Sequence, residues 1–173
     1  MESTSPYRIP GMELIDHSFT LPLDYNDPAA RKIKVFVREV RDLDPKSEEK
    51  PLLLFLQGGP GFRAPLPIKK EGWLKRALSE FRVLMYDTRG NGLSTPVSHQ
   101  TLAAEGDAVE QADYLKHFRA DNIVRDAEAI RAHMSPNEPW STIGQSYGGW
   151  CTTTYLSLHP EGLKECFIFG GVP

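Results

Sequence analysis

Features of secreted and membrane-bound proteins are scarce in this sequence of 173 residues. Its two cysteines, Cys151 and Cys166, are too few for a disulfide framework or a metal site, and their apolar surroundings favour buried thiols. The longest apolar run, residues 52–56, is far too short to cross a bilayer. The first residues have neither the basic start nor the apolar core of a secretory signal. We therefore expect a cytoplasmic protein.

An excess of basic residues is also missing. The net charge is −3, so neither nucleic acid nor an anionic membrane is expected as a partner. No motif in the chain calls for a metal or another cofactor, and the expected cofactor content is none. The composition, 40% hydrophobic and 25% charged, is that of an ordinary globular domain.

Hydrophobic patterns predict an α/β fold. Six runs are typical of strands, namely residues 17–23, 32–40, 52–56, 81–86, 140–143 and 166–169. Several of them are continuously apolar, as strands of a parallel sheet are when both faces are buried. Residues 1–15, punctuated by proline and glycine, are expected to be an irregular lead-in.

Helices are predicted between these strands, at residues 70–79, 121–134 and 150–158. The middle one has one apolar face, formed by Ile123, Ala127, Ile130 and Met134. Asp121 is expected to cap its N-terminus, whereas the acidic stretch 97–113 gives no clear pattern. Alternating strands and helices indicate one α/β domain over residues 1–173, with a mostly parallel sheet and helices on both faces.

Residues 144–148 read G-Q-S-Y-G, and they lie between a predicted strand and a predicted helix. That order is typical of the nucleophile elbow of serine hydrolases, which would make Ser146 the nucleophile. The turn holds the serine in a strained conformation, and the flanking glycines avoid clashes with the neighbouring strand and helix. The motif is short, and a glycine-rich turn without catalytic function is the alternative.

Acyl transfer also needs two backbone N–H donors for the oxyanion. One is expected from Tyr147, directly after the serine, and the other from the loop 57–61, which follows the buried strand 52–56. Glycines in that loop let the backbone approach a substrate oxygen closely. An ordinary tight turn remains possible, and a phosphate cradle is disfavoured because no Gly-Lys-Ser/Thr follows.

Five segments together resemble the prolyl aminopeptidase (proline iminopeptidase) family of α/β-hydrolase serine peptidases. Three are glycine-rich loops: Q-G-G-P-G at 57–61, D-T-R-G-N-G-L-S-T at 87–95 and G-Q-S-Y-G-G at 144–149. Two others resemble the larger subgroup of that family, Y-L-K-H-F-R-A-D at 114–121 and L-S-L-H-P-E-G-L at 156–163. The resemblance runs from about residue 16 to the last residue.

The resemblance implies release of N-terminal proline from peptides with a free N-terminus. It matches Ser146 to the nucleophile, and Gly59 and Tyr147 to the oxyanion donors. It also implies that Asp87 and Arg89 hold a structural loop by hydrogen bonds. Many members of the family begin the oxyanion loop with His, whereas this chain has Gln57, as the larger subgroup does.

A catalytic base is missing from the sequence. In α/β-hydrolases an Asp or Glu and a His follow the nucleophile along the chain, but here only His159 follows Ser146, with no Asp. Thirteen helical residues would place His159 about 20 Å from Ser146, against the ~3 Å of proton transfer. The remaining histidines are expected to be surface or core residues: His17, His99, His117 and His133.

Members of the family are longer, so we expect an α/β-hydrolase domain that is truncated before the cap domain and the last strands. The chain is then either the N-terminal catalytic portion of a prolyl aminopeptidase or a non-catalytic truncated relative. Another serine hydrolase, such as an esterase, is a third option, while the serine nucleophile argues against an epoxide hydrolase. In each case residues 1–173 alone are expected to be inactive.

Overall fold

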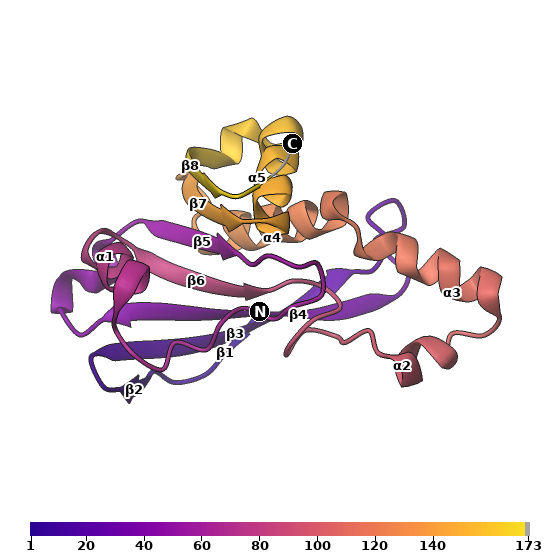
Figure 1. Ribbon diagram of the computed structural model, residues 1–173, viewed down its shortest axis with the longest axis horizontal. Coiled ribbons are helices and arrows are strands. Elements are labelled where there is room, and N and C mark those ends of the chain that lie inside the picture. The colour runs from indigo at the N-terminus through magenta and orange to yellow at the C-terminus, as the bar shows by residue number, and fades with distance from the viewer. Residues whose placement is uncertain (172–173) are drawn as a thin grey trace.

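The computed structural model describes residues 1–171 and contains one mixed sheet of eight strands (Figure 1). The strands are β1 (Glu2–Ser3), β2 (Tyr7–Ile9), β3 (Met12–Pro22), β4 (Lys32–Asp42), β5 (Leu52–Leu56), β6 (Arg82–Asp87), β7 (Trp140–Gln145) and β8 (Leu163–Phe169). Their order across the sheet is β1-β3-β4-β6-β5-β7-β8, and β2 pairs with β3 beside β1. The predicted α/β class is confirmed.

The half of the sheet that carries the glycine-rich loops is parallel. β5 lies between β6 and β7, and β8 pairs with the far side of β7, all in parallel. Every residue of β5 is buried, as its continuous apolar sequence predicts. Because parallel strands end at the same edge, the loops after β5, β6 and β7 come together there.

The other half is antiparallel and begins earlier than the sequence suggested. β3 and β4 form a long hairpin in full register from Met12–Asp42 to Pro22–Lys32. The irregular lead-in expected at 1–15 is wrong, because β1 and β2 both pair with β3, and β3 itself starts at residue 12. Gly11, at φ +80°, makes the tight turn between β2 and β3. The proline and glycine of this segment therefore mark a turn between two strands rather than an irregular segment.

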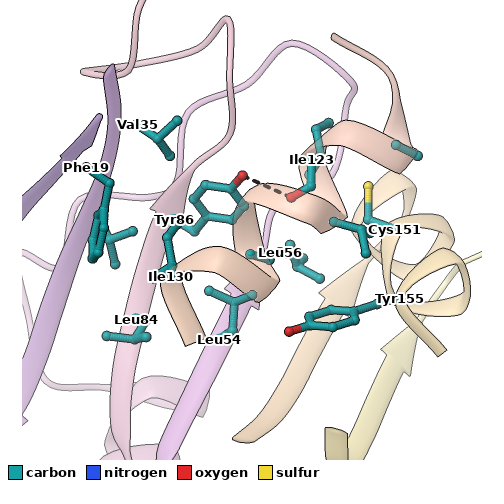
Figure 2. Close-up of a cluster of buried hydrophobic side chains, with 14 of the residues drawn as sticks. Phe19, Val35, Leu54, Leu56, Leu84, Tyr86, Ile123, Ile130, Cys151 and Tyr155 are labelled. Atoms are coloured by element: carbon teal, nitrogen blue, oxygen red, sulfur yellow. Dashed lines mark hydrogen bonds between the residues drawn. The ribbon is translucent and has the colours of Figure 1, made fainter. Parts of the chain in front are cut away.

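Helices cover both faces of the parallel half, as expected. α4 (Ala120–Met134) and α5 (Tyr147–Leu158) lie on one face, and α1 (Gly72–Glu80) lies on the other (Figure 1). Figure 2 shows the core under α4 and α5, where Leu54 and Leu56 of β5 pack with Ile123, Ile130 and Tyr155. In the same core the buried Tyr86 hydroxyl donates to the backbone oxygen of Ile123 at 3.2 Å.

Two helices occur in the stretch 97–115, where no clear hydrophobic pattern is present. α2 (His99–Ala103) and α3 (Ala108–Leu115) are short, largely exposed and extend away from the sheet (Figure 1). Each begins with a capping box, Ser98 with Thr101 and Asp107 with Glu110. These helices are started by local capping rather than by an apolar face, so the hydrophobic pattern does not predict them.

The cap assigned to α4 is also wrong. Its N-cap residue is Arg119, which makes no side-chain capping bond, and Asp121 lies in the first turn instead. There its carboxylate still faces the positive end of the helix dipole. Short 3-10 segments complete the chain at η1 (Pro45–Glu49), η2 (Lys116–Phe118) and η3 (Pro160–Gly162). Within residues 1–171 no helix is long and apolar enough to cross a membrane.

Candidate active site

Ser146 lies between the end of β7 and the start of α5, where the sequence motif predicted an elbow. Its backbone has φ 52° and ψ −118°, and among the described residues it alone has a positive φ without being glycine. Its N–H donates to the carbonyl oxygen of Phe169 at 2.8 Å, and its own carbonyl accepts from Gly149 at 2.8 Å. The side chain is exposed. The strained backbone thus presents the hydroxyl outside the sheet.

The glycines on either side of Ser146 are required by close packing. A Cβ on Gly144 would lie 2.3 Å from the carbonyl oxygen of Gly148. A Cβ on Gly148 would lie 1.9 Å from the carbonyl oxygen of Leu56, on the neighbouring strand. Both distances are far below van der Waals contact, so any side chain would force the sheet and α5 apart. The turn is therefore a tight elbow rather than a loose glycine-rich loop.

The loop 57–61 lies directly beside the serine. A Cβ placed on Gly58 would be 3.1 Å from Ser146 Cβ and 3.7 Å from Ser146 Oγ. The next residue, Gly59, has φ +122°, a conformation that favours glycine. Tyr147 is the first residue of α5, so its free N–H points out of the helix N-terminus. The two segments expected to supply oxyanion donors are thus adjacent to one another at Ser146.

Asp87, the last residue of β6, holds the loop after that strand by hydrogen bonds. Its two carboxylate oxygens accept from the backbone N–H groups of Ala64 and Leu93, each at 2.8 Å. Gly92 must be glycine here, because a Cβ would lie 2.0 Å from Asp87 Oδ2. Since Ala64 belongs to the segment that follows the loop 57–61, Asp87 ties this segment to the loop after β6.

Arg89 makes a buried ion pair that sequence reasoning missed. Its Nε and Nη2 donate to the two carboxylate oxygens of Asp126 on α4 at 2.7 and 2.6 Å, and both side chains are fully buried. Tyr25 completes the cluster by donating its hydroxyl to Asp126 at 2.7 Å. Burial alone would lower the pKa of Arg89, but the hydrogen bonds and charge of Asp126 outweigh it, so the pKa lies above its ordinary value.

The signal for this pair was present in the sequence. Asp126 lies three residues after Ile123 and one before Ala127, on the apolar face of α4. A carboxylate on a buried helix face requires a charged or hydrogen-bonding partner. The partner itself could not be named, because Arg89 is 37 residues away in the chain.

A cavity of about 280 Å³ lies where the three loops meet. Gly58, Gly90 and Tyr147 contribute one wall from each loop, and Phe118 and Ile123 line the side toward α4. The three glycine-rich loops therefore meet at one edge of the sheet. Cys151 also lines the cavity, but burial raises the pKa of its thiol to about 12, so the thiol is neutral and does not compete with Ser146 as a nucleophile.

The described histidines make no hydrogen bond to Ser146. Ser146 and His159 flank the two ends of α5, which separates them by about 20 Å. His17 is buried and lies 3.1 Å from Glu39, on the antiparallel half of the sheet. His133 lies at the C-terminal end of α4 against Phe19. His99 and His117 lie on α2 and η2. Within residues 1–171 no histidine is a hydrogen-bond partner of Ser146.

The sequence profile of the family described as the alpha/beta hydrolase fold matches residues 51–172, which include the elbow and both neighbouring loops. The chain belongs to the α/β-hydrolase family. Its resemblance to prolyl aminopeptidases is also confirmed, because it is 52% identical to the proline iminopeptidase of Aeromonas sobria over 99% of this chain and 40% of that protein. It is 42% identical to proline iminopeptidase aneH of Aspergillus aculeatus over 88% of this chain and 36% of that protein.

Two solved structures have a similar fold. A putative lipase from Acinetobacter baumannii AYE matches with a TM-score of 0.55 and 18% identity, over 91% of this chain and 42% of that one. The protein VinJ matches with a TM-score of 0.60 and 19% identity, over 90% of this chain and 44% of that one. This chain thus spans about two fifths of the length of its relatives.

Proposed function

We propose that this chain supplies the nucleophile and the oxyanion donors of a serine aminopeptidase that releases N-terminal proline from peptides. The observation that carries the proposal is the strained, exposed Ser146 with the backbone of Gly58 packed against its side chain. Serine hydrolases need this juxtaposition of a nucleophile and a backbone loop for acyl transfer. The proline preference rests on the names of the Aeromonas and Aspergillus relatives.

In the proposed reaction, Ser146 Oγ attacks the carbonyl carbon of the first peptide bond and gives its proton to a base. The carbonyl oxygen becomes an oxyanion, which accepts hydrogen bonds from the N–H groups of Gly59 and Tyr147. The N-terminus of α5 adds a favourable dipole at the same place. The C–N bond then breaks, the leaving amine takes the proton from the base, and water releases proline from the acyl-enzyme.

The base is proposed to come from the part of the longer relatives that has no counterpart in this chain. Residues 1–173 alone would then have no significant peptidase activity, because the Ser146 hydroxyl keeps its proton at neutral pH. Oxyanion stabilisation without a base leaves at most ~10³–10⁴-fold over water, far below an enzyme's usual rate. We also propose a cytoplasmic location, because both cysteines are free thiols.

The test uses an extended enzyme, in which residues 1–173 are followed by the segment of the Aeromonas sobria relative that this chain does not match. It should hydrolyse a proline-terminated chromogenic substrate, and Ser146→Ala should lower kcat by about 10⁴-fold or more. The control is Ser157→Ala, an exposed serine near the other end of α5. Retention of a tenth of kcat by Ser146→Ala would refute the nucleophile. Activity of residues 1–173 alone, abolished by Ser146→Ala, would show that the chain contains its own base.

A further inference from the structure

Three side chains in the antiparallel half of the sheet form a hydrogen-bonded line that the peptidase site does not use. Ser3 Oγ on β1 lies 2.8 Å from His17 Nδ1 on β3, and His17 Nε2 lies 3.1 Å from Glu39 Oε2 on β4. These strands are neighbours in the sheet (Figure 1). A serine, a histidine and a carboxylate in this order are the groups that activate the nucleophile of serine hydrolases, here with the two imidazole nitrogens exchanged.

The register of the strands brings the three side chains together. Ser3 is directly opposite His17 in the pairing of β1 with β3, and His17 is directly opposite Val37 in the pairing of β3 with β4. Glu39 lies two residues beyond Val37, so its side chain points to the same face of the sheet and reaches His17 diagonally. The line is therefore built on paired strands, which hold its members in fixed positions.

Two arginines keep Glu39 in its ionised form. Its Oε1 accepts from Arg41 Nε at 2.7 Å and from Arg82 Nη1 at 3.1 Å, and its Oε2 faces His17. Because an ionised carboxylate can only accept, His17 Nε2 donates to it, and the neutral imidazole then has no proton on Nδ1. Nδ1 accepts from the Ser3 hydroxyl, which is the arrangement in which a histidine acts as a general base.

The histidine and the carboxylate are buried, whereas the serine is not. His17 is 6% exposed and Glu39 is 1% exposed, so the imidazole is shielded from water and held in one orientation. Ser3 is exposed, close to the N-terminus of the chain. A small molecule in solution can therefore reach Ser3 Oγ, while the proton of that hydroxyl is directed into the sheet.

We propose that Ser3 is a second acyl acceptor of this chain, which takes the acyl group of activated esters with His17 as the general base. Ser3 Oγ attacks the carbonyl carbon of the ester, and its proton passes to His17 Nδ1. The C–O bond to the leaving group then breaks, the leaving alcoholate takes the proton from His17, and an acyl ester of Ser3 remains. An activated ester is needed because the N–H of Thr4 already donates to the carbonyl oxygen of Asp16 at 2.9 Å and is not free for an oxyanion.

The test uses p-nitrophenyl acetate and residues 1–173 carrying Ser146→Ala, so that the nucleophile of the proposed peptidase cannot take the acetyl group. Tandem mass spectrometry of the N-terminal peptide measures acetylation at each residue. Ser5 is the matched control in the same molecule, because it is exposed between β1 and β2 and bonds to no histidine within residues 1–171.

We expect Ser3 to be acetylated about tenfold faster than Ser5 or more, since a general base typically contributes ~10²–10⁴-fold. His17→Gln should make the two rates similar, because glutamine can keep a hydrogen bond to Ser3 but cannot take its proton. Unfolding the chain in urea should also make the rates similar, and this measurement does not depend on whether the His17 variant folds.

Equal rates at Ser3 and Ser5 in the folded chain would overturn the proposal, and the line of hydrogen bonds would then only fasten β1 to β3. A preference for Ser3 that persists in folded His17→Gln, or in urea, would overturn it as well. Because the test protein lacks the Ser146 hydroxyl, its result is independent of the peptidase proposal.

Discussion

The loop after β6 and the elbow after β7 lie on either side of β5 at one edge of the sheet, but they hold their important side chains in opposite ways. Arg89 and Asp126 are fully buried and satisfy each other with two hydrogen bonds. Ser146 is exposed, its backbone is strained, and its hydroxyl has no hydrogen-bond partner within residues 1–171. The first arrangement stabilises the fold, and the second leaves a reactive group available to a substrate.

The largest expected effect on stability comes from breaking the buried pair. Asp126→Ala leaves the Arg89 guanidinium buried without its counter-charge, which should cost about 3–5 kcal/mol in the free energy of unfolding. Urea denaturation of the purified chain measures this. Asp121→Ala is the matched control, because Asp121 pairs with Arg125 on the same helix but is half exposed. That variant should lose less than about 1 kcal/mol. Equal losses of unfolding free energy in the two variants would show that the buried pair of Arg89 and Asp126 stabilises the fold no more than an exposed pair does.

Glu39, a buried carboxylate in the antiparallel half of the sheet, tests whether buried ion pairs stabilise the fold elsewhere too. Burial alone would raise the pKa of Glu39, but hydrogen bonds and charges from His17, Arg41 and Arg82 lower it to about 2, below the ordinary value of 4.5. Because the folded pKa is the lower one, the stabilisation is complete above pH 4.5 and is lost as the pH falls toward 2. The loss should reach up to about 3 kcal/mol.

Unfolding free energies between pH 6 and 2 check this prediction. Glu39→Gln should be less stable at pH 6 and should show a flatter dependence on pH than the unaltered chain. Glu13→Gln serves as the control, because its partner Arg8 is largely exposed, and it should leave the pH dependence unchanged. An unaltered chain that keeps its full stability down to pH 2 would contradict the lowered pKa.

Changes near Ser146 should instead affect turnover. Gly59→Val in the extended enzyme should lower kcat by about 10²-fold, the usual effect of losing one oxyanion donor. Gly61→Val is the control, since Gly61 also has a positive φ but lies two residues farther along the loop. Both variants strain the loop, and unfolding curves will show how much. An effect on KM alone, or equal loss of kcat in both variants, would argue against Gly59 as a donor.

The smallest expected effect on stability comes from Tyr25, whose hydroxyl bonds to Asp126 beside Arg89. Tyr25→Phe removes the hydroxyl that donates to Asp126 at 2.7 Å, while the bidentate bonds from Arg89 remain. A hydrogen bond to a charged group contributes about 1.5–3 kcal/mol, and we expect the low end because Asp126 keeps its main partner. Urea denaturation measures the loss. A cost as large as that of Asp126→Ala would mean that tyrosine, rather than arginine, holds the carboxylate.

Parts of the fold that are set by local sequence could be predicted, and parts set by distant partners could not. The elbow, the loop 57–61 and strand β5 each combine an apolar run with glycine at fixed positions, so their conformation is visible in a few residues. The strand at residue 12 is visible only once β4 is placed beside it. α2 and α3 were missed because caps rather than apolar faces start them.

The candidate site shows the same division. Ser146 and its neighbours follow from a motif, because the strain of the turn is encoded by the glycines around it. Asp126 and Tyr25 had no motif, and their pairing depends on how the hairpin β3–β4, the loop after β6 and the helix α4 meet in space. Side chains that support a loop from another element are therefore the part of a site that sequence patterns reveal least.

The hydrogen bond from Ser146 N–H to the carbonyl oxygen of Phe169 joins the reactive turn to the last residue of the outermost strand. Fraying of β8 would remove this anchor. The serine would then lose the backbone orientation that aims it at a substrate. The order of the outermost strand and the orientation of the nucleophile are therefore coupled by this one bond.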